Sequence, residues 1–308
     1  MNRTSKIKCR VLPCSWRHHL IGGGWGDISK ELKKVFHDNR SPIDLYTAYE
    51  YQVRERVSRP FVAFFHQVVS GYERSLKKIL NSKVWEHNQK FFLGGFVFSK
   101  NQLAYIEKKI FSQPIRLVLH PTPMKVKRWY LNSFLKDPTF LHAGIHCRNV
   151  DFFVGVANQR QQREKYILLA PRKRDYTSYL SRYPKTGIEI KSRMSNVEYN
   201  EALASSVVFI NLLEAAANNT ILECIARGTP LLVNNIGGVE DYLGKKYPLY
   251  YGSTKHAEQI IGKIKRDPSI LNRAHAYLLK RRQKFLMQRF LQQIESGLKT
   301  MIKNYDYY

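Results

Sequence analysis

The chain has 308 residues, of which 44% are hydrophobic and 13% aromatic, a composition that excludes global disorder and can build one large or two ordinary domains. No apolar run approaches the roughly 20 residues of a membrane-spanning helix. The first residues are basic but lack the apolar core of a signal peptide, so we expect a cytoplasmic protein.

The balance of charge indicates an anionic partner. Lys and Arg number 51 against 24 Asp and Glu, which gives a formal net charge of +27. Nucleic acid, phospholipid head groups and phosphorylated small molecules all fit this balance. The basic residues are spread over the whole chain, and a solvated basic surface is the alternative interpretation.

The four cysteines indicate neither a disulfide framework nor a zinc site. Only Cys9 and Cys14 are close in sequence, Cys147 and Cys224 are isolated, and no CxxC motif occurs. We expect four reduced thiols.

The first half of the chain alternates between strand and helix patterns. A glycine cluster at 22–26 precedes an amphipathic helix that ends near Phe36, with Asp27 as its expected N-cap. The cluster has neither the Lys-Ser/Thr of a P-loop nor the spacing of a dinucleotide-binding fingerprint, so a plain turn competes with a site-lining loop. Further along the chain we expect strands over 59–66, 92–99 and 115–120 and helices over 72–81 and 101–110.

Pro121-Thr122-Pro123 interrupts the alternation and predicts a crossover to a second domain. Strands are then expected over 140–145, 165–170, 187–191, 207–210 and 230–233, and helices over 195–204 (with Ser195 as N-cap) and 220–226. This alternation predicts two doubly wound parallel sheets. We place the domains at 1–122 and 123–266, followed by a helical segment over 267–308.

The most informative segment is 211–244, NLLEAAANNTILECIARGTPLLVNNIGGVEDYLG. A buried strand leads into a polar loop at Asn218 and Asn219, and Thr220 opens a helix. Free N–H groups at a helix start attract a diphosphate. Glu223 lies near the same helix start, close enough for its carboxylate to accept hydrogen bonds from a ribose diol.

A second loop follows the next strand. Gly237-Gly238 makes a tight turn there, and Glu240 comes directly behind it. In open α/β sheets, ligands bind at the carboxyl ends of the strands, which is where both loops are expected.

The segment resembles the nucleotide-binding half of the glycosyl group-one transferases, which have the GT-B fold. Their second Glu matches Glu223, their GTP matches Gly228–Pro230, and their Gly-Gly loop matches Gly237 and Gly238. One departure stands out: the family has seven residues between its two Glu residues, whereas eight separate Glu214 from Glu223. Ala215 stands at the strict position. Either the loop carries an insertion or the first Glu is absent, so Glu214 is a candidate for the donor-sugar contact.

The resemblance is looser elsewhere. Residues 61–66 resemble the strand that brings a His to the interdomain cleft, which makes His66 a candidate for contact with the donor sugar, its phosphate or the acceptor; a structural His is the alternative. Residues 141–149 resemble the first strand and loop of the donor domain. There, Gly144 would allow close approach of phosphate and Arg148 would pair with phosphate oxygens, unless Arg148 is one more surface arginine.

The resemblance implies a GT-B-like α/β fold, with two Rossmann-like domains facing a cleft and additional C-terminal helices. It implies a hexosyltransferase-like enzyme that moves a sugar from a nucleotide-diphosphate sugar to a hydroxyl of a glycan or lipid-linked acceptor, with retention at the anomeric carbon. No Asp-x-Asp pair has a convincing strand context, so we expect neither a metal nor another cofactor. Helix N-termini and basic side chains would balance the charge of the leaving group.

Two other interpretations are open. The charge of +27 suggests a nucleic-acid-binding protein, although no RNA-binding or helix-turn-helix signature is present. The altered Glu spacing suggests a degenerate GT-B protein that binds a ligand without turnover. Basicity also fits peripheral docking at the inner face of an anionic membrane.

Overall fold

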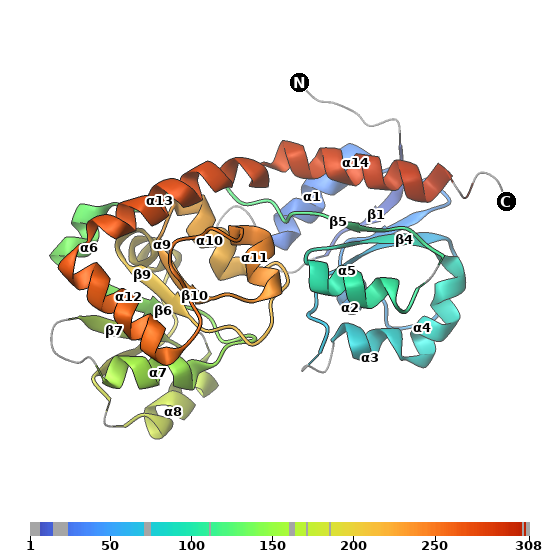
Figure 1. The fold of residues 1–308 in the computed structure, drawn as a ribbon. Coiled ribbons are helices and arrows are strands. Elements are labelled where there is room, and N and C mark those ends of the chain that lie inside the picture. Colours follow the sequence, from blue (N-terminus) through green and yellow to red (C-terminus); the bar gives the residue numbers. More distant parts are fainter. Residues whose placement is uncertain are drawn as a thin grey trace. The chain divides into compact units, whose positions relative to one another are not determined.

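A computed structural model describes residues 7–14, 24–70, 75–110, 112–159, 164–170, 172–184, 186–303 and 305. The chain forms two compact units, one from Met1–Pro121 with Lys284–Tyr308 and the other from Thr122–Gln283. Each unit has its own parallel β-sheet (Figure 1). Within the described residues, no helix has both the length and the apolar composition of a membrane-spanning helix.

The division between the units differs from the expected boundaries by one residue at the first boundary and by more in the C-terminal segment. The first division falls between Pro121 and Thr122, but the helical segment expected over 267–308 is no separate part. Residues up to Gln283 belong to the second unit, where α13 (Ser269–Arg282) contacts α10 (Asn219–Arg227). The rest belongs to the first unit, where α14 (Met287–Lys303) contacts the sheet.

Unit 1 contains a five-stranded parallel sheet. Its strands, in spatial order, are β1 (Arg10–Leu12), β2 (Asp44–Tyr46), β3 (Phe61–Phe65), β4 (Phe92–Val97) and β5 (Ile115–Leu117). Its helices besides α14 are α1 (Trp25–Phe36), α2 (Tyr49–Gln52), α3 (Leu76–Leu80), α4 (Lys83–Asn88), η1 (Gln89–Phe91) and α5 (Lys100–Glu107), with η2 (Gln283–Phe285) at the border of the units.

A parallel bridge between Cys9 and His37 explains how this sheet is doubly wound. The bridge places the chain that leaves α1 on one side of β1, whereas β2 pairs with the other side. The winding direction therefore reverses beside β1, as the sequence predicts. Gly24, rather than Asp27, is the N-cap of α1, because the helix begins at Trp25 and Asp27 already lies in its first turn. Gly22 and Gly23 lie outside the described residues.

Both faces of the unit 1 sheet are covered, so β3 is buried along its whole length. Phe61 and Phe65 belong to a core cluster with Trp85 of α4. Phe64 points to the opposite face, where its ring contacts Trp25 of α1. In Figure 1, α14 runs along that face, and α3, α4 and α5 lie on the other.

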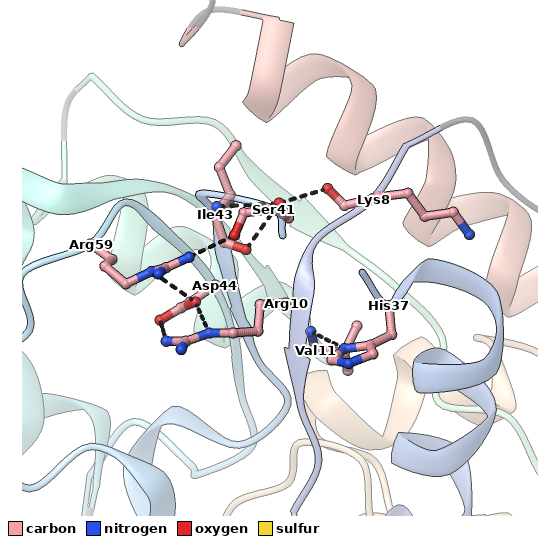
Figure 2. Close-up of polar contacts among 8 residues, drawn as sticks. All are labelled: Lys8, Arg10, Val11, His37, Ser41, Ile43, Asp44 and Arg59. Atoms are coloured by element: carbon pink, nitrogen blue, oxygen red, sulfur yellow. Dashed lines mark hydrogen bonds and ion pairs between the residues drawn. The ribbon is translucent and has the colours of Figure 1, made fainter. Parts of the chain in front are cut away.

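The amino end of this sheet is held by a buried carboxylate (Figure 2). Asp44, at the start of β2, accepts hydrogen bonds of 2.7 Å from both Nε and Nη2 of Arg10 in β1. Nε of Arg59 lies 3.5 Å from the same carboxylate, and its Nη2 donates to the Ser41 carbonyl oxygen at 2.6 Å. Two guanidinium groups thus satisfy one buried charge and join the first three strands.

Unit 2 contains a six-stranded parallel sheet in the order β11-β10-β9-β6-β7-β8. Its strands are β6 (Thr139–His142), β7 (Lys165–Leu169), β8 (Ile188–Lys191), β9 (Val207–Ile210), β10 (Leu231–Asn234) and β11 (Tyr250–Tyr251). Its remaining helices are α6 (Leu131–Lys136), α7 (Val150–Asn158), α8 (Lys173–Arg182), α9 (Asn196–Ser205), α11 (Gly237–Leu243) and α12 (Thr254–Arg266).

Counted from β6, this order is the dinucleotide-binding order 3-2-1-4-5-6, so the winding direction reverses between β6 and β9. The expected N-cap Ser195 begins α9, and a reciprocal capping box with Glu198 completes it. Sheet order alone therefore identifies the carboxyl ends of β6 and β9 as the place where unit 2 would hold a ligand.

Candidate functional site

Two loops meet at the carboxyl ends of β6 and β9. Asn149 N–H donates to the Asn211 carbonyl oxygen at 3.0 Å, and Leu213 N–H donates to that of Cys147 at 2.9 Å. Cys147 has φ +55°, a left-handed conformation that a residue other than glycine rarely adopts. The two loops therefore form one backbone-bonded structure rather than separate surface turns.

Arg148 lies on the first loop and reaches the start of α10. Its Nη2 donates to Thr220 Oγ1 at 2.7 Å and lies 3.5 Å from Asn218 Oδ1, and its Nη1 donates to the His146 carbonyl oxygen at 2.8 Å. Gly144 has φ +84°, and a Cβ there would lie 2.8 Å from the guanidinium carbon of Arg148. The arginine is therefore held by the site rather than extended into solvent.

The start of α10 is capped by a side chain of the preceding loop. Asn218 is the N-cap, and its side chain accepts a hydrogen bond of 3.2 Å from the N–H of Ile221. Asn219 is the first helical residue and is half-buried. The structure thus brings four predicted residues, Gly144, Arg148, Asn218 and Thr220, to one place beside Asn219.

Glu223 lies one turn further along α10 and is only 3% exposed. Its Oε2 accepts a hydrogen bond of 2.6 Å from the Tyr199 hydroxyl of α9. Burial raises the pKa of the Glu223 carboxyl to about 7, against the opposing effects of the Tyr199 hydrogen bond and of the cations Arg227 and Arg148. Arg227 is itself buried and donates to Asn200 Oδ1 and to the Glu223 carbonyl oxygen.

Gly237 and Gly238, which we expected in a tight loop, instead form the first turn of α11, where Gly238 packs against the loop after β9. An ideal Cβ on Gly238 would lie 2.0 Å from the Ala215 carbonyl oxygen, so the two backbones approach more closely than any side chain permits. Gly237 is the first residue of α11. Ala215, at the family's strict position, is 4% exposed, whereas Glu214 is half-buried in the same loop.

In unit 1, His66 follows directly after β3, as predicted. Its Nε2 lies 2.9 Å from the Thr47 carbonyl oxygen. Because a carbonyl oxygen only accepts, Nε2 carries the hydrogen in this contact. The ring contacts Trp25 at 4.2 Å and Phe98 at 4.7 Å between centroids.

The backbone at His66 is held by a buried glutamate that sequence reasoning missed. Oε1 of Glu50 accepts the N–H groups of His66 and of Gln67, the latter at 2.8 Å. Burial raises the pKa of the Glu50 carboxyl to about 7, and these backbone hydrogen bonds act in the opposite direction. Gln102 of α5 donates to the carbonyl oxygens of Phe65 and Gln67 from the other side.

Arg227 carried a usable sequence signal, because it follows Glu223 by four residues on a predicted helix and the two would share a face. Tyr199 and Glu50 carried none, since each meets its partner only through the fold. Within the described ranges, no group of three His, Cys, Asp or Glu side chains has a metal-binding arrangement.

Comparison with solved structures establishes the fold. HepE from Anabaena, in complex with UDP-glucose, matches over 88% of this chain and 80% of its own, with 12% identity and a TM-score of 0.65. WaaG, a glycosyltransferase involved in lipopolysaccharide biosynthesis, matches over 93% and 84%, with 13% identity and a TM-score of 0.55. TarM matches over 89% of this chain with 12% identity and a TM-score of 0.60, but this chain spans only 58% of the length of TarM.

No family model and no curated relative matches the sequence. At this level of identity the likeness concerns architecture alone. The predicted α/β fold of the GT-B type is thereby confirmed.

Proposed function

We propose that this chain is a glycosyltransferase that moves a sugar from a nucleotide-diphosphate sugar to an acceptor hydroxyl, with the donor bound by unit 2. One observation carries the proposal: Arg148, the N-terminus of α10 and Glu223 all lie around the point where the winding of the unit 2 sheet reverses. The shared fold of HepE, which was solved with UDP-glucose, supports it.

Each residue of the unit 2 site has a proposed role. Arg148 and the N-terminus of α10, at Asn219 and Thr220, meet the diphosphate with positive charge and N–H donors. Gly144, Gly237 and Gly238 keep side chains away from the phosphate path. The carboxylate of Glu223 accepts hydrogen bonds from the ribose hydroxyls.

In unit 1 we propose that His66 contacts the donor sugar or the acceptor. His66 follows directly after β3, at the carboxyl end of that strand, where ligands bind in open α/β sheets. Glu214 is proposed to contact the donor sugar. We further propose retention at the anomeric carbon and turnover without a divalent metal, with Arg148 and α10 supplying the charge.

The proposed acceptor is a glycan or a lipid-linked glycan, and the proposed location is the cytoplasm, with docking at the inner face of a membrane. The net charge of +27 supports attraction to anionic lipid. Sedimentation with vesicles tests this proposal. Binding should be stronger to vesicles with an anionic phospholipid than to neutral ones, and equal partitioning would rule the membrane out.

A thermal-shift screen tests the donor site. Purified protein is heated with UDP, GDP, ADP, CMP and their common sugar conjugates, and a ligand that binds only the folded state raises the midpoint. At a ligand concentration of 100 Kd the stabilisation is about 2.7 kcal/mol. We expect a shift with one diphosphate, its loss in Glu223→Ala, and its retention in the control Glu201→Ala, which alters an exposed carboxylate of the same unit.

A protein that binds the donor without turnover is the second candidate. The observation that favours it is Ala215, which is packed beneath Gly238 where the family has its first Glu. Slow release of free sugar from the bound donor, abolished in His66→Ala, would reject this candidate. Absence of a shift with every nucleotide would instead overturn the proposed donor site and make RNA the next ligand to test.

A further inference from the structure

We propose that Tyr199 is a positioning residue that keeps Oε1 of Glu223 available to a ribose hydroxyl, and that this pair makes the site prefer ribonucleotides to deoxyribonucleotides. The inference rests on the proposed function. It goes beyond that function because it assigns the choice between ribose and deoxyribose in the nucleotide to Tyr199, a residue on the neighbouring helix α9.

The first step is the unequal environment of the two carboxylate oxygens. Oε2 accepts the 2.6 Å hydrogen bond from the Tyr199 hydroxyl. Oε1 accepts no hydrogen bond from the residues that the structure describes. A carboxylate can accept several hydrogen bonds, so one oxygen is occupied and the other can receive a donor from a ligand.

The second step is that α9 fixes this arrangement. Tyr199 and its neighbour Asn200 contact two charged residues of α10, since Tyr199 donates to Glu223 and Asn200 accepts from Arg227. A capping box between Ser195 and Glu198 defines where α9 begins. The packing of α9 against α10 therefore places the Tyr199 hydroxyl beside Glu223.

The third step is the chemistry of recognition. A ribose hydroxyl that donates to an ionised carboxylate forms a charge-assisted hydrogen bond, which is stronger than a neutral one. A deoxyribose lacks one donor and leaves the buried carboxylate less satisfied. The site therefore discriminates between the two sugars most strongly while Glu223 is ionised.

This condition gives the pair a signature in pH. Burial raises the pKa of Glu223 to about 7, and the hydrogen bond from Tyr199 acts to lower it. Ribonucleotide binding should weaken as the pH falls through about 7, because the carboxyl becomes protonated. Removing the Tyr199 hydroxyl raises the pKa of Glu223 further and moves that midpoint to higher pH.

Calorimetric titration tests the inference in wild type and Tyr199→Phe. The probes are UDP-glucose, GDP-glucose and ADP-glucose, and the tightest binder is compared with its 2′-deoxyribose counterpart from about pH 6 to about pH 9. Sugar nucleotides are used because their diphosphate has no group that titrates in this range. We expect Tyr199→Phe to bind the ribonucleotide about tenfold more weakly, with less preference for ribose and a higher midpoint pH.

Tyr277→Phe is the matched control, because Tyr277 is also half-buried in unit 2 and donates to the Leu243 carbonyl oxygen at 2.8 Å. It should keep wild-type affinity, preference and midpoint. A folded Tyr199→Phe that keeps the ribose preference and the wild-type midpoint would overturn the inference while leaving the proposed function intact.

If Tyr199→Phe does not fold, Glu223→Gln is used to test whether the Glu223 carboxylate sets the ribose preference and its pH dependence. It should bind with a flat pH profile and little preference for ribose, and an unchanged profile would overturn the inference. If wild-type protein binds none of the three sugar nucleotides, the proposed function itself is rejected.

Discussion

Glu50 in unit 1 and Glu223 in unit 2 have the same electrostatic signature and different surroundings. Burial raises the pKa of each carboxyl to about 7. Glu50 accepts two backbone N–H groups, whereas Glu223 accepts one side-chain hydroxyl and lies beside the buried cation Arg227. A raised pKa therefore does not identify a ligand site by itself, and the partners of the carboxylate distinguish a structural role from a binding role.

The largest effect is expected from a substitution that disrupts the close backbone contact between Gly238 and Ala215 in unit 2. In Gly238→Ala, the new Cβ meets the Ala215 carbonyl oxygen at 2.0 Å, so one backbone segment must move. We expect a loss of about 3 kcal/mol in unfolding free energy and loss of nucleotide binding, measured by urea denaturation and calorimetry. The control is Gly155→Ala in α7, where nothing lies within 4 Å of the added Cβ and stability should hold or rise.

The comparison is sharpened by replacing each carboxylate with an amide. Each folded pKa of about 7 lies above the ordinary 4.5, so the folded state holds more protons between these values. The unfolding free energy therefore falls as the pH rises through this window, by about 3 kcal/mol for each group. Glu50→Gln and Glu223→Gln should each remove about half of this combined fall, measured by urea denaturation at several pH values.

Only Glu223→Gln should also flatten the pH dependence of nucleotide binding. If Glu50→Gln flattened it equally, Glu50 would belong to the binding machinery and the contrast between the two carboxylates would be wrong.

A smaller effect is expected at the proposed diphosphate contact. Arg148→Ala removes a guanidinium held between Thr220 and Asn218, and the loss of charge-assisted hydrogen bonds should weaken nucleotide binding by about 2 kcal/mol, roughly 30-fold. Arg182→Ala is the control, because Arg182 is an exposed arginine of the same unit that pairs with Asp151. Equal weakening in both variants would indicate general attraction by a basic surface rather than a site.

The smallest effect separates helix capping from binding. Asn218→Ala and Ser195→Ala each remove an N-cap hydrogen bond and should each cost about 1 kcal/mol in unfolding free energy. Only Asn218→Ala should also weaken nucleotide binding, because Asn218 begins the helix that faces the proposed diphosphate. Calorimetry on both variants measures this, and unaltered binding in Asn218→Ala would place the diphosphate elsewhere.

The sequence by itself determined the alternation of strands and helices and the crossover near Pro121. It also singled out the segment from Asn211 to Gly244 as a candidate for ligand binding. Each of these features depends on residues that are close together in the chain. Gly144, Arg148, Asn218 and Thr220 could be nominated for the same reason, since glycines, caps and charged residues after buried strands are local signals.

Only the tertiary structure decided what these residues contact. Tyr199 meets Glu223 across two helices, and Glu50 meets the backbone at His66 from a separate helix, so neither pairing leaves a periodic trace in the sequence. The C-terminal helices show the same limit: their amphipathic pattern predicts that they pack, but not that α13 joins unit 2 while α14 joins unit 1. A local pattern specifies which face of an element is buried, whereas its partner is selected by complementary surfaces that the fold assembles from distant parts of the chain.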